Sequence, residues 1–272
     1  MSVSFCTIAS GSGGNSVFIS GKNQSILIDA GLSGKVIERG LNGIGISAKD
    51  ISAVFLTHEH NDHTRGAGIL SRRYDIPIYT TAGTWKRMSS DRISAKNQHT
   101  VKADKPIELG KMRILPFSIP HDAAEPVGYS IMIEGRKISV ATDLGYITPN
   151  VAEYIYGSDI ILIESNHDIE MLRNCRYPAY LKRRILGEGG HLSNIAAGLF
   201  IKEIFSPKTK HIFLGHLSQE NNRPMLAYDT VREILTSSKI NVGKDCCIYL
   251  ASRKFASPLF TLNSDKSEIN SK

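Results

Sequence analysis

Apolar positions along the chain fall in short runs separated by Gly-rich or polar turns, which is the pattern of β-strands joined by tight connections. Two stretches with apolar residues at helical spacing, Lys35–Leu41 and Gly66–Tyr74, interrupt this pattern in the first half. Each of them is followed by a further apolar run. The strands predicted for this half are Val3–Ile8, Ser16–Ile19, Ser25–Asp29, Ala53–Thr57 and Ile76–Thr80.

The second half also begins with strands and continues with helices. Three β-type runs joined by short turns, Lys111–Ile119, Val127–Ile133 and Lys137–Thr142, precede a stretch in which strands and helices alternate. Ser193 or Asn194 is expected to cap a helix that continues to Phe205. The remaining predictions are strands at Asp159–Ile163, Lys210–Leu214 and Cys246–Leu250 and helices at Asn150–Tyr156, Ile169–Asn174, Pro178–Leu186 and Pro224–Leu235.

Two halves of this kind predict an α+β protein, a four-layer αββα sandwich in which helices cover two sheets. Each half contains an apolar strand that ends on Asp, with Gly two residues later, at Asp29 and at Asp143. We expect residues 1–255 to form one domain of this type. Segment 256–272 ends in ten almost wholly polar residues, and we expect it to be a polar, flexible tail.

Composition and charge narrow the class of protein. Apolar residues make up 41% and charged residues 22% of the chain, which is ordinary for a globular protein. The N-terminus lacks the basic start and apolar core of a signal peptide, so a cytoplasmic protein without membrane contact is expected. The four cysteines form no disulfide framework. A net charge of +7 favours acidic partners, nucleic acid first.

The densest cluster of candidate metal ligands follows the apolar run Ala53–Leu56. His58, His60, Asp62 and His63 lie there within six residues. Alternate residues of an extended chain point the same way, so His58 and His60 can present their imidazoles to one ion. Asp62 and His63, at the turn into the next helix, can face a second ion. Imidazole and carboxylate ligands together indicate a site for zinc or a similar borderline metal.

Four ligands do not complete two metal sites, so further His, Asp or Glu side chains are expected where other strands end. His121, Asp143 and His216 each follow a predicted strand and meet this expectation. Asp143 is the natural bridge between two ions, because a carboxylate has two oxygens. We therefore expect two divalent metal ions, and the mixed ligand set accepts Zn²⁺ or Mn²⁺.

The motif His58-x-His60-x-Asp62-His63, with a strand-end Asp before it and three strand-end ligands after it, resembles the metallo-β-lactamase superfamily over residues 1 to about 250. The resemblance implies that Asp29 orients the ligands without binding metal itself. It further implies one ion held by His58, His60, His121 and Asp143, and a second held by Asp62, His63, Asp143 and His216.

Five further segments are similar to the YycJ subgroup of that superfamily, also called WalJ or VicX, whose members are linked to exonuclease activity on DNA. These segments are 11–16, 163–168, 177–185, 190–194 and 216–224. Only 73 positions separate Asp143 from His216, too few for the extra domain of β-CASP nucleases. The Gly/Pro-rich arm of the RNase Z type is also missing, so a minimal nuclease core is expected.

The resemblance implies a dinuclear phosphodiesterase in which two ions hold a bridging hydroxide as the nucleophile. Asp62 is the candidate general base. His191 is the candidate general acid that protonates the leaving oxygen, because a matching His has this role in the RNase Z type. Glu164, at the end of a predicted strand, is expected to hydrogen-bond His191 or a metal ligand.

Other residues are candidates for binding the substrate, a nucleic acid that is expected to be DNA rather than RNA. The loop that contains Ser12 and Asn15 can cradle a phosphate or form a plain turn. His167 is expected to line the substrate groove. A basic run is either a track for phosphates or a solvated helix face, and it contains Lys182, Arg183 and Arg184.

Four other functions are compatible with parts of the pattern. A thioester hydrolase of the glyoxalase II type leaves His191 and the basic run unexplained. Another small-molecule phosphodiesterase would use the same metal centre. A β-lactamase is expected to carry a secretion signal, and a binding module with a structural metal is expected to have lost some of the ligands.

Overall fold

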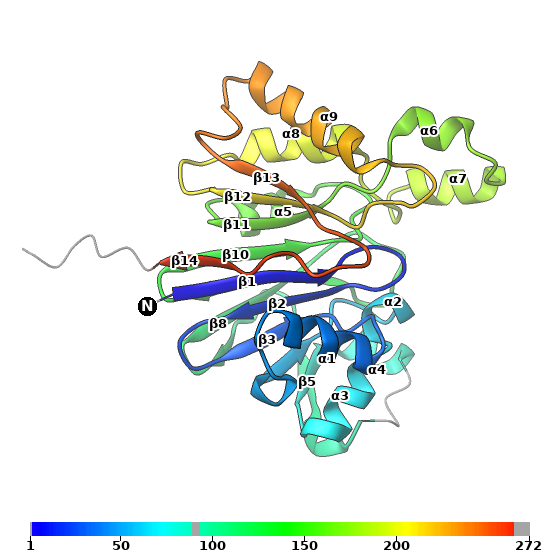
Figure 1. Cartoon of the computed structure of the whole chain (residues 1–272). Helices are drawn as coiled ribbons and strands as arrows, with labels where there is room; N and C mark the ends of the chain where they lie inside the picture. Colours follow the sequence, from blue (N-terminus) through cyan, green and yellow to red (C-terminus); the bar gives the residue numbers. More distant parts are fainter. Residues whose placement is uncertain (1, 89–92, 264–272) are drawn as a thin grey trace, which may run out of the picture.

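The computed structural model describes residues 2–88 and 93–263, and its strands form two seven-stranded sheets that pack face to face (Figure 1). The strand order is β14-β1-β2-β3-β4-β5-β6 in the first sheet and β13-β12-β11-β10-β9-β8-β7 in the second. The first sheet contains β1 (Ser2–Ala9), β2 (Ser16–Ser20), β3 (Ser25–Ile28), β4 (Ala53–Phe55), β5 (Ile78–Thr81), β6 (Gln98–Val101) and β14 (Phe260–Asn263). The second contains β7 (Ile107–Leu109), β8 (Met112–Ser118), β9 (Val127–Ile133), β10 (Arg136–Ala141), β11 (Ile160–Glu164), β12 (His211–Gly215) and β13 (Cys247–Leu250).

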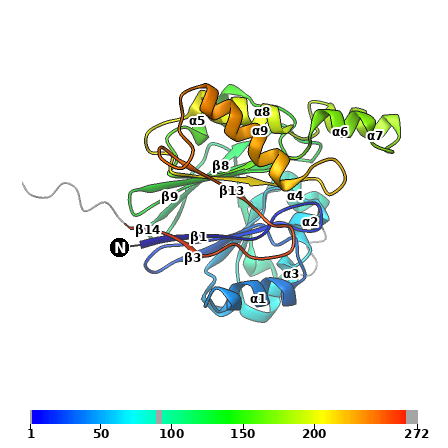
Figure 2. The ribbon, with the colours of Figure 1, turned by 45° about the horizontal axis from the view of Figure 1, so that its top comes forward.

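Helices cover the outer face of each sheet, so the layers run helix, sheet, sheet, helix (Figure 2). The first sheet is covered by α1 (Gly34–Gly43) and α3 (Ala67–Tyr74), and the second by α5 (Pro149–Ile155), α8 (Asn194–Ile204) and α9 (Pro224–Ser237). The remaining helices are α2 (Asn61–Thr64), α4 (Ala82–Arg87), α6 (Ile169–Asn174) and α7 (Ala179–Leu186). The predicted αββα sandwich is confirmed.

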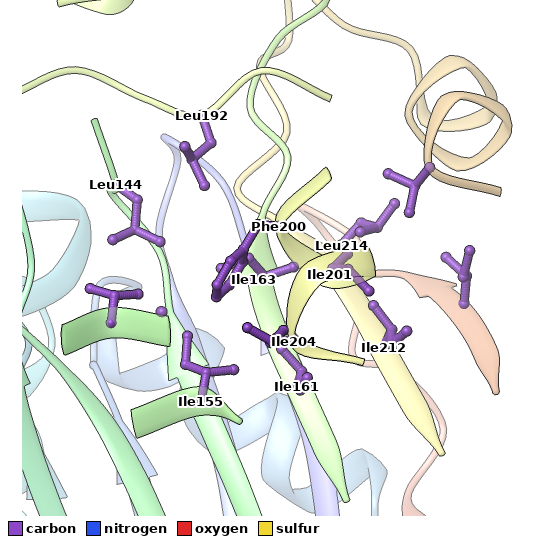
Figure 3. Close-up of a cluster of buried hydrophobic side chains, with 14 of the residues drawn as sticks. Leu144, Ile155, Ile161, Ile163, Leu192, Phe200, Ile201, Ile204, Ile212 and Leu214 are labelled. Carbon is purple, nitrogen blue, oxygen red and sulfur yellow. The ribbon is translucent and has the colours of Figure 1, made fainter. Parts of the chain in front are cut away.

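An inner strand of the second sheet, β11, shows why its sequence is apolar without interruption from Ile160 to Ile163. In β11, Ile160 and Leu162 pack between the two sheets, whereas Ile161 and Ile163 pack against the outer helices. Successive side chains of a strand point to opposite faces, so a strand covered on both sides needs apolar residues at every position. Figure 3 shows the outer cluster, in which Ile161 and Ile163 meet Phe200 and other residues of α8.

The direction of the strands gathers several loops at one edge of the sandwich. β3 to β6 run parallel to one another in the first sheet, and β10 to β13 do so in the second. The carboxyl ends of parallel strands lie at the same edge, so the segments after β3, β4, β10, β11 and β12 can meet there. The pair α6 and α7 projects from this edge in both views (Figures 1 and 2).

The structure corrects the expected tail. Phe260–Asn263 form β14, which pairs antiparallel with β1 from Ser2↔Asn263 to Phe5↔Phe260, and Phe260 and Leu262 pack against the core between the sheets. Up to residue 263, the segment from 256 onward is therefore part of the fold and not a tail, because its alternating apolar residues complete the first sheet. Residues 264–272 of the expected tail lie outside the described residues.

Within residues 2–88 and 93–263, seven short elements were not predicted from the pattern: α2, α4, β6, β7, β14 and the 3-10 helices Ala48–Asp50 and Ala95–Asn97. Ser193 caps α8 as expected, since its side chain accepts a hydrogen bond from the backbone N–H of Ala196. Within the described ranges, every helix is too short or too polar to cross a membrane.

Candidate metal centre and active site

Two histidines of the loop between β4 and α2, His58 and His60, lie close to a third histidine, His121. His58 Nε2 lies 3.0 Å from His60 Nδ1, and His121 Nε2 lies 3.4 Å from the same His60 atom. His121 comes from the segment after β8 in the other sheet. The ligand atoms of these three residues all lie within 4.8 Å of one another, a spacing that can hold a metal ion.

Asp62, His63 and His216 form a second group beside the first. Asp62 Oδ2 is 3.6 Å from His63 Nε2 and 3.7 Å from His216 Nε2. This group also meets the spacing that can hold an ion. His63 follows β4 of the first sheet and His216 follows β12 of the second, so the group connects the two sheets at their common edge.

Asp143 lies between the two groups. Its Oδ1 is 3.8 Å from His121 Nε2, and its Oδ2 is 3.1 Å from His63 Nε2. Asp143 Oδ2 and His216 Nε2 are both buried, and neither has a hydrogen-bond partner among residues 2–88 and 93–263. Buried polar atoms without partners are costly unless a ligand satisfies them. These two atoms, surrounded by other nitrogen and oxygen donors, fit divalent cations.

The pKa values of the histidines differ within the cluster. Burial and the neighbouring histidines hold the pKa of His58 well below its ordinary value, which keeps it in the neutral form that binds metals. Burial also acts to lower the pKa of His63, but Asp29 and Asp143 raise it well above the ordinary value. The pKa of His216 is likewise raised well above its ordinary value by Asp143, Asp62 and Glu164, although burial acts to lower it. A divalent cation would take the place of these two protons among the buried carboxylates.

Asp29 and Thr57 hold the ligand histidines from behind. Asp29 Oδ2 lies 2.8 Å from His63 Nδ1, and Asp29 Oδ1 accepts a hydrogen bond from the backbone N–H of Thr57 at 2.8 Å. The Thr57 hydroxyl lies 2.9 Å from His58 Nδ1. Asp29 thus contacts His63, and the orienting role that the resemblance implies for it stays a prediction. Thr57 was missed from the sequence, where its only signal is its place directly before His58.

Glu164 joins two histidines through one oxygen. Its Oε1 lies 2.9 Å from His191 Nδ1 and 2.7 Å from His216 Nδ1, and its Oε2 accepts the backbone N–H groups of Leu144 and Leu192. Although burial acts to raise the pKa of Glu164, the charges and hydrogen bonds of His191 and His216 lower it to about 2. The pKa of His191 is raised by Glu164 and Asp143 against the effect of burial. These contacts favour the protonated form of His191 and leave Nε2 as the ring nitrogen that is not bonded to Glu164.

Residues of the loop after β1 contact two of the candidate metal ligands, His216 and His63. The Ser10 hydroxyl accepts a hydrogen bond from the backbone N–H of His216 at 2.9 Å, a contact missed from the sequence. Asn15 Nδ2 lies 3.1 Å from His63 Nε2, while its Oδ1 accepts from the Gly11 N–H at 2.8 Å. Asn15 is buried, which differs from the open phosphate cradle expected for it, whereas Ser12 is exposed on the same loop.

The other substrate candidates lie outside the cluster of candidate metal ligands. His167 is buried, both of its ring nitrogens lack hydrogen-bond partners in the described chain, and burial lowers its pKa to about 4. On α7, Lys182 donates to the backbone oxygen of Arg173, and Arg184 donates to Asp122, the neighbour of His121. Arg183 is exposed. The basic run is thus partly paired, and Arg184 connects the projecting helices to the centre.

Three strand-end residues of the centre have left-handed backbone conformations. The φ angles are 63° at Asp29, 62° at Asp143 and 54° at His216. Positive φ is uncommon for residues other than Gly, is most often tolerated by Asn and Asp, and costs on the order of 1–3 kcal/mol where it is strained. These conformations turn the chain sharply as each strand ends, and no feature of the sequence pattern announces them.

The parallel strands of the two sheets bring the candidate histidine and aspartate ligands to one edge of the sandwich. This arrangement is typical of metal-dependent hydrolases with an αββα fold, and the family comparison agrees with it. A model of the beta-lactamase superfamily domain matches residues 24–210. The metallo-β-lactamase fold protein YhfI from Bacillus subtilis has a TM-score of 0.72 to this structure at 16% sequence identity, covering 94% of this chain and 99% of that one. The chain belongs to the metallo-β-lactamase superfamily and is a hydrolase.

Within the superfamily, the chain belongs to the YycJ/WalJ subgroup. It is 37% identical over 246 residues to the exodeoxyribonuclease YycJ of Bacillus anthracis, covering 90% of this chain and 93% of that protein. It is also 37% identical over 259 residues to the exodeoxyribonuclease WalJ of Streptococcus pneumoniae, covering 94% of this chain and 96% of that protein. The resemblance drawn from the motifs is confirmed.

Proposed function

We propose that the protein is a dinuclear metal-dependent phosphodiesterase, an exonuclease that acts on DNA. The observation that carries the proposal is the bond between Glu164 and His191, which favours the protonated imidazole beside the candidate metal ligands. An alkoxide leaving group of a phosphodiester needs such a proton, whereas a thiolate leaves without one. The thioester alternative gives His191 no task. The names of the YycJ and WalJ relatives support the same substrate class.

Two divalent ions, Zn²⁺ or Mn²⁺, complete the proposed centre. One would be held by His58, His60, His121 and Asp143, and the other by Asp62, His63, Asp143 and His216. When bound, a pair of such ions activates a water molecule and stabilises negative charge on the attacked phosphate.

The chain itself supplies the proton transfers. The neighbouring His216, whose Nε2 lies 3.7 Å from Asp62 Oδ2, and the charge of His63 lower the pKa of Asp62 against the effect of burial, so its carboxylate is ionised and can accept the proton of the attacking water. His191 gives its Nε2 proton to the leaving oxygen, while Glu164 fixes Nδ1 and stabilises the charged ring. Asp29 and Thr57 hold the ligand rings in position during both transfers.

The projecting helices α6 and α7 are the proposed contact for the DNA backbone. Arg183 is exposed there, and Arg184 lies at the point where α7 meets the loop of His121. Basic side chains beside the centre attract phosphates, and the net charge of +7 acts in the same direction. His167, which is neutral and buried, would shape the groove without adding charge.

The test is cleavage of end-labelled single- and double-stranded DNA and RNA by the metal-loaded protein beside an Asp143→Asn control. The proposal expects the wild type to shorten DNA stepwise and the variant to be at least about 1000-fold slower, because the shared carboxylate ligand is lost. Nitrocefin and S-lactoylglutathione are assayed in parallel. Turnover of either compound without any cleavage of nucleic acid would contradict the proposal.

A further inference from the structure

The chain crosses from the second sheet to the first at the edge that carries the metal centre (Figure 1). Leaving β13, Ala251 donates its N–H to Leu214 of β12, and Ser10 donates its N–H to the backbone oxygen of Ser252. Further on, Ser257 donates to Thr7 before β14 begins. The residues Ser252–Phe255, here named the crossover segment, are thereby fixed against the same loop that supports His216.

A pocket of about 360 Å³ opens beside this segment. Leu217, Ser218 and Pro224 form one wall, and the chain from Leu250 to Phe255 forms the other. The first wall begins one residue after His216, and Ser10 bonds the backbone of both His216 and Ser252, so the pocket lies on the His216 side of the metal centre. The volume falls within the range of pockets that bind small ligands.

Arg253 indicates the charge of the occupant. Its Nη1 is buried and has no hydrogen-bond partner in the described part of the chain. The alkyl part of its side chain lies over Gly11, where an added Cβ would be only 2.7 Å from Arg253 Cγ, so the glycine is needed for this placement. Arg253 as a whole lines the pocket and is partly exposed, and phosphate is an anion that its planar guanidinium matches.

The rest of the pocket suits a nucleobase. The Phe255 side chain is 73% exposed, an unusual exposure for a large aromatic ring, and Leu217 and Pro224 add apolar surface opposite the segment. Lys254, which is exposed, adds a second positive charge. An aromatic face next to cations is the combination that binds single-stranded nucleic acid, since bases stack and phosphates pair.

We propose that this pocket is a nucleotide subsite, in which Phe255 stacks on a base of the DNA strand and Arg253, with Lys254, binds an attached phosphate. The inference rests on the proposed nuclease function and adds the surface that positions the strand beside the centre. It places a part of the substrate site at the crossover segment, on the side of the centre formed by His216, in addition to the basic helix α7.

The experiment compares Phe255→Ala and Arg253→Met with two matched controls in the metal-loaded protein. Met keeps the alkyl contact with Gly11 and removes the guanidinium group, with its charge and its hydrogen-bond donors. The controls are Tyr156→Ala and Arg113→Met, two exposed residues near the strand ends opposite the metal centre. For each variant, kcat and KM are measured on a single-stranded oligonucleotide and kcat/KM on bis-p-nitrophenyl phosphate.

Each pocket variant is expected to raise KM for the oligonucleotide about tenfold, and to lower the ratio of kcat/KM between DNA and bis-p-nitrophenyl phosphate by a similar factor. The controls should keep the wild-type ratio. If the wild type cleaves DNA and both pocket variants keep its KM, the subsite is overturned and the nuclease function stands.

A wild type that cleaves no DNA would instead overturn the proposed function, and the subsite is then tested by binding alone. The dissociation constant of thymidine monophosphate is measured by calorimetry for the wild type and for Arg253→Met. A loss of at least about tenfold in affinity in the variant supports a nucleotide site, whereas equal affinity, or no binding to either protein, overturns it.

Discussion

Replacing Glu164 with Gln tests the proposed acid directly. Glu164 is buried, and its Oε1 bonds both His191 and His216. Gln keeps the size and an acceptor oxygen but removes the charge that raises the pKa of His191. A hydrogen bond to a charged group contributes about 1.5–3 kcal/mol, and one pKa unit corresponds to about 1.4 kcal/mol. The pKa of His191 should therefore fall, because the ion pair that favours the charged ring is lost.

The sign of the pH effect follows from the role of His191 as a proton donor. Only the protonated ring can donate, so activity is lost as pH rises through the pKa of His191. In Glu164→Gln that loss should occur at lower pH, and kcat on DNA at pH 8 should fall about 10- to 100-fold. Bis-p-nitrophenyl phosphate provides the control assay, since p-nitrophenolate leaves without protonation and its turnover should fall far less.

The measurement is the pH profile of kcat for both substrates, together with the metal content of each protein by elemental analysis, because Glu164 also contacts the ligand His216. An equal loss on both substrates at full metal content would refute the acid role of His191. So would an unshifted profile on DNA.

Four further predictions concern metal, stability and DNA binding. Asp29→Asn should weaken metal affinity about 10- to 100-fold in a chelator competition, because the carboxylate that orients His63 is lost, and unchanged affinity would contradict its role. Removing metal with EDTA should lower the Tm in calorimetry, since ions at 100 times their Kd stabilise the folded state by about 2.7 kcal/mol; a constant Tm would count against a bound ion. Leu214→Ala, in the buried cluster of β12, should lower the free energy of unfolding in urea by about 2–5 kcal/mol, against a small change for the half-exposed Leu199→Ala. Arg183→Met should reduce the slope of log Kd for DNA against log salt by about one, and an unchanged slope would exclude a phosphate contact at α7.

Most of the fold could be predicted because the central strands are covered on both faces. β11 and β12 are apolar at all but their terminal positions, and such runs are recognisable without knowing their neighbours. The missed strands β6 and β7 have only four and three residues, most of them partly exposed, so they show no clear period. β14 was missed because its few apolar residues precede a polar end of the chain, and only pairing with β1 gives them a structure.

The candidate ligands could be predicted for a related reason. His58, Asp143 and His216 follow strands whose ends meet at one edge, so sequence position translates into spatial proximity. The supporting contacts of Thr57 and Ser10 could not be predicted, because hydroxyl residues are common and their partners depend on the path of each loop. The pocket at Phe255 joins segments more than twenty residues apart, and that proximity exists only after folding.

The left-handed backbone at Asp29, Asp143 and His216 restricts which residues evolution and protein engineering can place there. Asn or Gly can keep the turn at positions 29 and 143, whereas a β-branched residue would add backbone strain to the loss of a ligand or of its support. An alanine variant therefore mixes two defects, and Asn is the cleaner probe of chemistry at both aspartates. A relative that had lost its metal could still keep Asp or Asn at these positions for conformational reasons alone. Retention of the aspartates is thus weak evidence of activity, and His58, His60 and Glu164, which have no such backbone requirement, are the more informative positions to compare.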